Sequence, residues 1–273
     1  MKRFFQGGLG LAGALLLLAL VVISTFPHLF ARRDPYAINA DARLRPPAAA
    51  HPFGTDELGR DVFSRVVWGT RISLGSALLV VGASGTAGTL LGLVAGYFGG
   101  RLDEALMRVA DVFIAFPALI MAMAMVALLG PGLTNAMLAI MIIWWPQYAR
   151  LARGQVAAEK VKPYSEAARA VGRRDLGILF RHILPNCWVP ILIKATLDIG
   201  VAILLTASLS FLGLGARPPT PELGALVTQG REHLLSAWWY STFPGLVMFV
   251  GVLACNLLGD SLRDVLDPVL STN

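Results

Sequence analysis

The amino-acid sequence predicts an all-α membrane protein with six transmembrane helices. The chain of 273 residues is 56% hydrophobic and only 15% charged, whereas about 25% of the residues in a soluble domain are charged. Its mean hydropathy is +0.65. Most of the apolar residues fall in long runs with few or no charges, and about 20 apolar residues are enough to cross a bilayer as a helix. We therefore expect most side chains to meet lipid or other helices.

Six segments have the length and composition of membrane-spanning helices. The predicted helices are 4–31, 72–100, 102–129, 133–148, 188–214 and 238–259. The triplet Gly130-Pro131-Gly132 separates the third from the fourth, because it is a strong turn signal. We interpret the first run as a retained helix, since it exceeds the apolar region of about 7–15 residues in a signal peptide. The chain then divides into 1–71, an N-terminal helix with an external loop, and 72–273, a five-helix core.

The distribution of charge predicts which side of the membrane the termini occupy. Lys2 and Arg3 precede the first helix, and six crossings place both termini on the same side. Lys and Arg are somewhat more numerous on that side, as expected for the cytoplasm, although the first outer loop is also basic. The net charge of +6 is dispersed among apolar runs, so we expect no nucleic-acid partner.

The second predicted helix carries small residues at intervals of four, which are Ser84, Gly88, Gly92 and Gly96. They fall on one helical face, where small side chains let a second backbone approach closely. Packing within the chain is the simpler interpretation, and an interface with another subunit is the alternative.

The sequence contains no motif that predicts catalysis. It has no Gly-Lys dipeptide and therefore no Walker A loop, and its four histidines form no HExxH motif. Cys187 and Cys255 are far apart and predict neither a disulfide framework nor a zinc site. We expect no catalytic residue, metal or cofactor in this chain, so another subunit must bind any ATP that drives it.

The most charged stretch, at about 150–186, connects the fourth and fifth predicted helices. Ala167, Ala168 and Val171 predict a small apolar stripe at helical spacing, which Glu166 precedes and Gly172 can end. The charged residues around this stripe are Arg169, Arg173, Arg174 and Asp175. Such a helix would let a groove of another protein come close. A solvated amphipathic loop is the alternative.

This stretch resembles the EAA loop of bacterial ABC importer permeases, whose pattern is Glu-Ala-Ala-x-x-x-Gly followed further on by Ile-x-Leu-Pro. Here Glu166 to Gly172 match the first part, and 182–186 reads His-Ile-Leu-Pro-Asn. His182 departs from the common Ile, in a form typical of the peptide and nickel branch. The resemblance identifies the loop as a cytoplasmic coupling loop.

Four further strings, in the same order, resemble the second-type permease of dipeptide and oligopeptide importers. They are 54–61 with Ser64 and Arg65, 209–215 with 218–222, 243–245, and 257–268. Two positions depart from many relatives, which have a carboxylate where Thr206 stands and a Trp where Leu223 stands. The resemblance covers nearly the whole chain but leaves the substrate open.

The resemblance implies a MetI-like bundle that forms half of a translocation pathway in the bacterial cytoplasmic (inner) membrane. The implied partners are a second homologous permease, two cytoplasmic ABC ATPase subunits that bind ATP and Mg²⁺, and an external substrate-binding protein. The implied coupling residues are Glu166, Ala167, Ala168, Arg169, Gly172 and Arg173. The cargo would be di- or oligopeptides, or alternatively nickel chelates or another small solute. An ATP-independent secondary transporter or channel would instead predict internal repeats, and we find no convincing one.

Lys194 and Asp198 are charges within the fifth predicted helix. Charges at such depth are costly, so each must face the bundle interior, a partner subunit or water. At a spacing of four residues the two side chains can pair. A structural pair is the simpler interpretation. The alternative is that Asp198 lines the pathway and meets the ammonium group of a peptide.

Overall fold

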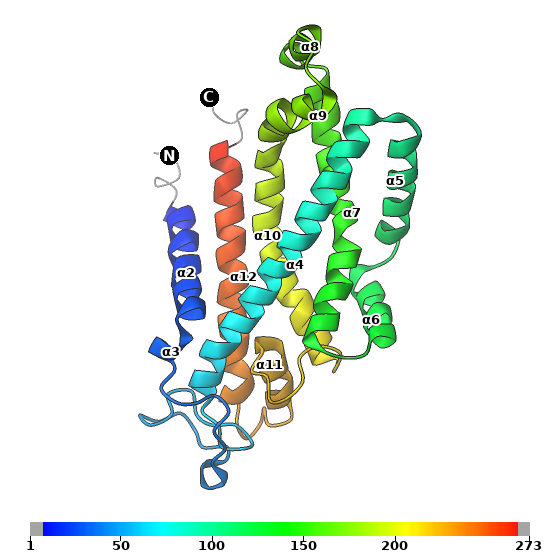
Figure 1. The fold of residues 1–273 in the computed structure, drawn as a ribbon. Coiled ribbons are helices and arrows are strands. Elements are labelled where there is room, and N and C mark those ends of the chain that lie inside the picture. The colour runs from blue at the N-terminus through cyan, green and yellow to red at the C-terminus, as the bar shows by residue number, and fades with distance from the viewer. Residues whose placement is uncertain (1–7, 267–273) are drawn as a thin grey trace.

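The long apolar runs form an upright helical bundle in the computed structural model, which describes residues 8–266 (Figure 1). Lys2, Arg3 and the last two residues of the string 257–268 lie outside the described residues. The helices are α2 (Gly8–Thr25), α3 (Pro27–Phe30), α4 (Val62–Phe98), α5 (Gly100–Ile114), α6 (Ala118–Leu129), α7 (Leu133–Lys160), α8 (Pro163–Ala170), α9 (Asp175–Ile178), α10 (Leu184–Phe211), α11 (Leu223–Arg231) and α12 (Trp239–Leu266). A 3₁₀ turn, Ala40–Ala42, and a π-helical turn, Leu179–Ile183, complete the order.

Each of the six predicted segments is helical over most of its length in the structure, and the third is in two pieces. Within residues 8–266, four helices are long and apolar enough to cross a membrane, namely α2, α4, the continuous helix Asp175–Phe211 and α12. The pair α5 and α6 forms a broken fifth segment with a bend of 90°. The sixth, α7, is less apolar because it holds Arg150 and Arg153, and it packs along α4.

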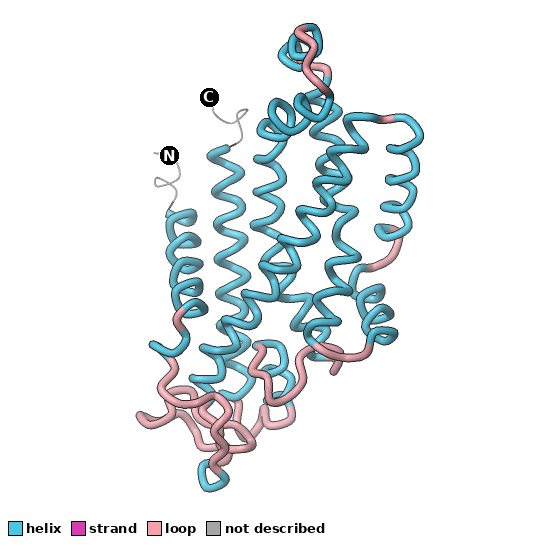
Figure 2. Tube along the Cα trace, in the orientation of Figure 1, coloured by secondary structure: helices cyan, strands magenta, loops and turns pink. Residues whose placement is uncertain are grey.

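The two ends of the bundle differ in structure. The beginning of α2, the end of α12 and the short helix α8 lie at one end (Figure 1). The loop 31–61 and the loops around α11 gather at the other end, as Figure 2 shows. The described ends of the chain therefore share the side of the charged loop that contains α8, as an even number of crossings requires.

The third predicted helix, 102–129, was wrong as a single element. The structure ends α5 at Ile114 and begins α6 at Ala118. Pro117 has no backbone N–H to donate and disfavours the helical conformation at the residue before it. The chain therefore leaves the helix before Pro117, and the second half-helix takes a new direction.

Several other predicted boundaries fall inside helices, and two of them lie ten residues or more from the observed end. The fourth helix was expected to end at Tyr148, but α7 continues to Lys160. Charged side chains mark where a helix leaves lipid, not where it stops, and on this part of α7 they pair with carboxylates of α5. The second was expected to begin at 72, but α4 begins at Val62 after Asp61, whose side chain accepts from Ser64 N at 2.8 Å as an N-cap. The division of the chain after residue 71 therefore falls within α4.

The small-residue face of α4 packs against α7 within the same chain. A Cβ atom added at Gly88 would lie 2.2 Å from the carbonyl oxygen of Trp145, and one at Gly92 would lie 2.2 Å from that of Ala149. The interpretation as packing within the chain is confirmed. The glycines allow the two helix backbones to meet directly.

We expect Gly92→Ala to destabilise the protein by about 1–3 kcal/mol, which is the usual cost of overpacking a close contact. The added methyl group would meet backbone atoms of α7, which cannot move away independently. Gly82→Ala is the matched control, because a Cβ there would meet no atom within 4 Å. Thermal unfolding of the purified variants in detergent measures both effects. Equal transition temperatures for Gly92→Ala and the native protein would contradict the α4–α7 contact.

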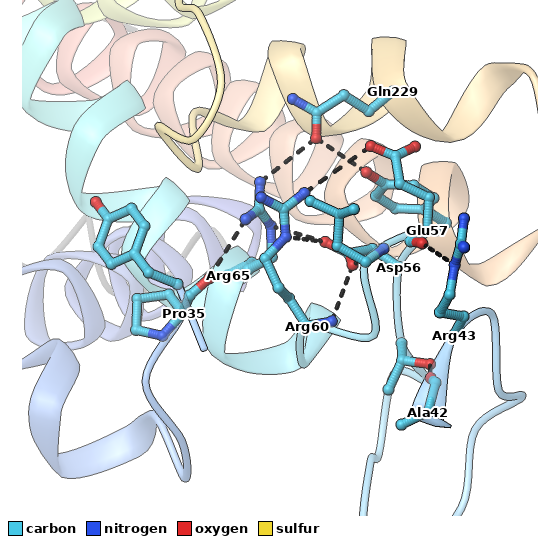
Figure 3. A network of polar contacts seen from close by, with 12 residues as sticks. Pro35, Ala42, Arg43, Asp56, Glu57, Arg60, Arg65 and Gln229 are labelled. Atoms are coloured by element: carbon cyan, nitrogen blue, oxygen red, sulfur yellow. Dashed lines mark hydrogen bonds and ion pairs between the residues drawn. The ribbon is translucent and has the colours of Figure 1, made fainter. Parts of the chain in front are cut away.

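Buried ion pairs stabilise the end of the bundle opposite α8. Asp56 is fully buried, accepts from Arg60 Nε at 2.6 Å and lies 3.5 Å from Arg65 Nε. Arg65 also donates to the carbonyl oxygen of Pro35 at 3.3 Å and to Gln229 Oε1 at 3.4 Å (Figure 3). These contacts join the loop 31–61 to α4 and α11. The string 54–61 therefore builds a structural junction.

Candidate coupling site

The short helix α8 projects beyond the end of the bundle (Figure 1). Pro163 occupies its first turn, where the missing N–H costs nothing. At its other end Gly172 has φ +77°. Gly172 N donates to Arg169 O at 2.9 Å and Arg173 N donates to Ala168 O at 3.2 Å, which is a Schellman motif. The prediction that Gly172 ends this helix is confirmed.

Most of the predicted coupling residues lie on the exposed face of α8 and its following turn. Those residues are Glu166, Ala167, Arg169, Gly172 and Arg173. A Cβ at Gly172 would meet no atom within 4 Å, so the requirement for glycine here is the backbone conformation alone. The exposed face is therefore free of steric contact with the rest of the described chain at this position.

Ala168 faces the bundle instead. Its exposed fraction is 8%, whereas that of Val171 is 78%, so the predicted stripe of Ala167, Ala168 and Val171 is not one exposed face. Ala168 joins a buried apolar cluster because the chain folds back through α9 and covers it. The other members of this cluster are Leu93, Tyr97, Val156, Ile178, Leu179, Ile183 and Cys187. The small side chain of Ala168 lets α8 lie close to the bundle.

Glu159 ties α8 to the end of α7. The Glu159 side chain is largely buried and accepts from Tyr164 Oη at 2.7 Å and from Lys162 Nζ at 2.6 Å. Burial, together with the hydrogen bond to Glu159, raises the pKa of Tyr164 to about 12. The Tyr164 hydroxyl therefore stays protonated at physiological pH and keeps its role as donor.

Tyr97, near the end of α4, contacts three other elements. Its hydroxyl donates to Asp175 Oδ1 of α9 at 2.6 Å. The guanidinium of Arg169 lies 5.7 Å and the ammonium of Lys160 lies 5.5 Å from the centroid of its ring, within the range of a cation–π interaction. A displacement of α8 would therefore be transmitted to both α4 and α7.

Sequence reasoning missed Tyr97, Glu159 and Tyr164. Their partners are assembled by the packing of α4 against α7 and by the return of the chain through α9, which no local pattern reveals. The only local indication for Tyr97 is a tyrosine at the end of an apolar run, separated by Phe98 from Gly99 and Gly100. The site as a whole is a short exposed helix whose inner side is attached to α4, α7 and α9.

The predicted pairing of Lys194 with Asp198 is confirmed. Lys194 Nζ lies 3.0 Å from Asp198 Oδ2 and also donates to Gln147 Oε1 at 3.1 Å. This pair belongs to the middle of α10. It is separate from the residues of α8, so the structure divides the predicted site residues into two groups.

The structure is a bundle of membrane-spanning helices. At one end a short helix, α8, projects from the bundle and is attached to it by several contacts. This is the architecture of a transport permease. The family model described as "Binding-protein-dependent transport system inner membrane component" matches residues 88–272. The chain belongs to this family. It is therefore a multi-pass membrane permease that works with a substrate-binding protein and an ATPase, and its relatives are transport proteins rather than enzymes.

Curated relatives match nearly the whole chain. A probable D,D-dipeptide transport system permease protein of Escherichia coli is 45% identical, over 95% of this chain and 87% of the relative. A dipeptide transport system permease protein of Haemophilus influenzae is 42% identical, over 98% and 92%. A glutathione transport system permease protein of Pectobacterium atrosepticum is 43% identical, over 99% and 90%. This chain is thus a permease subunit of the ABC importer type.

A solved structure has the same fold. A chain from the inward-facing MetNI methionine ABC transporter superposes with a TM-score of 0.53 at 22% identity, covering 71% of this chain and 94% of that chain. At this level of identity the comparison supports the predicted MetI-like bundle.

Proposed function

We propose that this chain forms half of the translocation pathway of an importer for short peptides in the bacterial inner membrane. The proposed partners are a second homologous permease, two ATPase subunits that bind ATP and Mg²⁺, and an external binding protein that delivers the peptide. The names of the relatives support this cargo, since they include D,D-dipeptide, dipeptide and glutathione transport. Nickel chelates or another small solute are the alternative cargo.

The proposed mechanism is based on one observation, the attachment of α8 to the ends of α4 and α7. The outer face of α8, with Glu166 and Ala167, is exposed. Its inner side is connected to Glu159 of α7 through Tyr164 and to the cluster around Tyr97 of α4 through Ala168. Arg169 is exposed as well, but its guanidinium also contacts the Tyr97 ring. We assign the outer face to a cleft of the ATPase subunit. Closure of the ATPase pair would then push α8, and the connections would turn this push into a movement of the bundle.

The proposed orientation follows from the same assignment. If α8 meets the ATPase in the cytoplasm, the beginning of α2 and the end of α12 are cytoplasmic as well, because they lie at the same end of the bundle (Figure 1). The loop 31–61 and α11 would then face the binding protein outside.

The test is to purify this chain with a candidate partner permease and ATPase pair and to measure ATP hydrolysis in lipid. We expect hydrolysis to rise on addition of a binding protein loaded with a dipeptide, and to rise less with the empty binding protein. Swapping the cargo identifies the substrate. Solute passage through liposomes that contain this chain alone would contradict the proposal and favour a channel or secondary transporter.

A further inference from the structure

A cavity of about 670 Å³ lies along α10, where α10 packs between α7 and α12 (Figure 1). Its volume is in the range of small-molecule sites. The residues of α10 that line it extend from Asn186, at the end of the bundle that carries α8, to Asp198. Arg263 and Leu266 of α12 border the cavity at that same end. We call this cavity the α10 groove.

The Lys194–Asp198 pair lies at the inner limit of the α10 groove. At 1.5 Å per residue, Lys194 and Asp198 are about 15 and 21 Å along α10 from Leu184, near the middle of the helix. Both side chains line the groove, with exposed fractions of 24% and 13%. A charge at the depth of a membrane centre normally faces water or a functional cavity, and the groove supplies that cavity.

The hydrogen bonding around the pair is incomplete. Lys194 Nζ has Asp198 and Gln147 as acceptors and lies 5.2 Å from the centroid of the Tyr148 ring. The Tyr148 hydroxyl is fully buried beside Asp198. Neither this hydroxyl nor Asp198 Oδ2 makes a hydrogen bond of good geometry among residues 8–266. A pair with a purely structural role would be expected to satisfy its buried neighbours.

We propose that the Lys194–Asp198 pair is a contact site for a zwitterionic short peptide, with Asp198 taking the ammonium and Lys194 the carboxylate. This inference rests on the proposed function. The two charged groups are 3.0 Å apart in the closed pair. Their Cα atoms are separated by a helical rise of about 6 Å, so the two side chains must turn away from each other to reach the ends of a dipeptide, whose two extended residues span roughly 7 Å. On binding, Lys194 and Asp198 would separate, and each would contact one end of the same dipeptide. Because the dipeptide is zwitterionic, no net charge enters the membrane.

The chain offers a low-background test of this site. Its two cysteines, Cys187 and Cys255, are buried, so a single Ile193→Cys substitution in the groove lining can be labelled selectively within this chain, which is then separated from the other subunits on a denaturing gel. In the assembled importer without nucleotide, we expect this thiol to react with a membrane-impermeant maleimide. Dialanine at twice its Kd or more should slow the reaction about threefold or more by occupancy, whereas uncharged N-acetylalanine amide should not.

Neutralising both members of the pair, as Lys194→Met with Asp198→Asn, is expected to abolish the protection without leaving one buried charge unpaired. Leu235→Cys is the control, because Leu235 is fully exposed in the loop between α11 and α12 and does not line the groove. Dialanine should not change its reactivity.

Three outcomes would overturn the inference. They are an unreactive Ile193→Cys, no protection by dialanine, or equal protection in the doubly neutralised variant. If ATP hydrolysis stimulated by the loaded binding protein persists in such a case, the proposed function stands and only the peptide site fails. If that stimulation is absent from the unmodified complex, the proposed function itself fails.

Discussion

Replacement of Gly172 by Glu is expected to lower solute uptake by the assembled importer by about tenfold or more, while the chain still inserts into the membrane. Gly172 has φ +77°, a conformation that costs a residue with a Cβ about 1–2 kcal/mol. The Schellman motif that ends α8 would be strained. The new carboxylate would also project from the exposed face that we assign to the ATPase cleft. Transport and ATP hydrolysis, measured on the same proteoliposomes, separate uncoupling from simple loss of protein.

Gly172→Asn is the matched control for this prediction. Asn tolerates the left-handed conformation, and a Cβ at this position meets no atom of the described chain. We therefore expect Gly172→Asn to retain most of the uptake if conformation is the main requirement, and to lose it if the cleft excludes any side chain. Normal uptake by Gly172→Glu would remove α8 from the coupling mechanism.

We expect a larger side chain in place of Ala168 to impair transport for a different reason. Because Ala168 is packed against the cluster that contains Tyr97 and Val156, a larger side chain there would push α8 away from the bundle and leave its outer face intact. In the Glu-Ala-Ala motif, Glu166 and Ala167 thus lie on the outer face that we propose for docking, and Ala168 lies inward and attaches α8 to the bundle.

The membrane-spanning segments could be predicted because an uncharged run of about 20 apolar residues matches the thickness of a bilayer when it folds as a helix. Their boundaries were less predictable. Pro117 was visible in the sequence, but whether a proline bends or ends a helix depends on what the next segment packs against. The end of α7 at Lys160 could not be recognised because the ion pairs Arg150–Asp111 and Arg153–Asp103 join residues that are distant in sequence.

The coupling loop shows the same division between local and tertiary information. The motif around Glu166 and the role of Gly172 as a helix stop depend on neighbouring residues, so sequence alone predicted them. The direction of Ala168 and the contacts of Tyr97 depend on α4, α7 and α9 meeting in space. The string 54–61 was recognised only as a resemblance, since the burial of its charges is a property of the fold.

Asp56→Ala is expected to destabilise the protein by about 3–5 kcal/mol, which is the typical cost of removing one partner of a buried ion pair. The substitution would leave the guanidinium groups of Arg60 and Arg65, which are 3% and 0% exposed, without their shared carboxylate. It would also remove the acceptor for the backbone N–H groups of Leu58 and Arg60. The loop 31–61 would then lose its attachment to α4 and α11.

Glu57→Gln is the matched control, because Glu57 is adjacent in sequence and its side chain is 33% exposed. Its contacts with Arg60 and His233 are long, at 3.9 and 3.6 Å, so we expect loss of the Glu57 charge to cost about 1 kcal/mol or less. Thermal unfolding can be followed by the exposure of the buried thiols Cys187 and Cys255 to a thiol-reactive dye. These cysteines lie in α10 and α12, away from Asp56, so their exposure reports the whole bundle. A normal transition for Asp56→Ala would mean that the two arginines find other partners and that this junction does not hold the end of the bundle together.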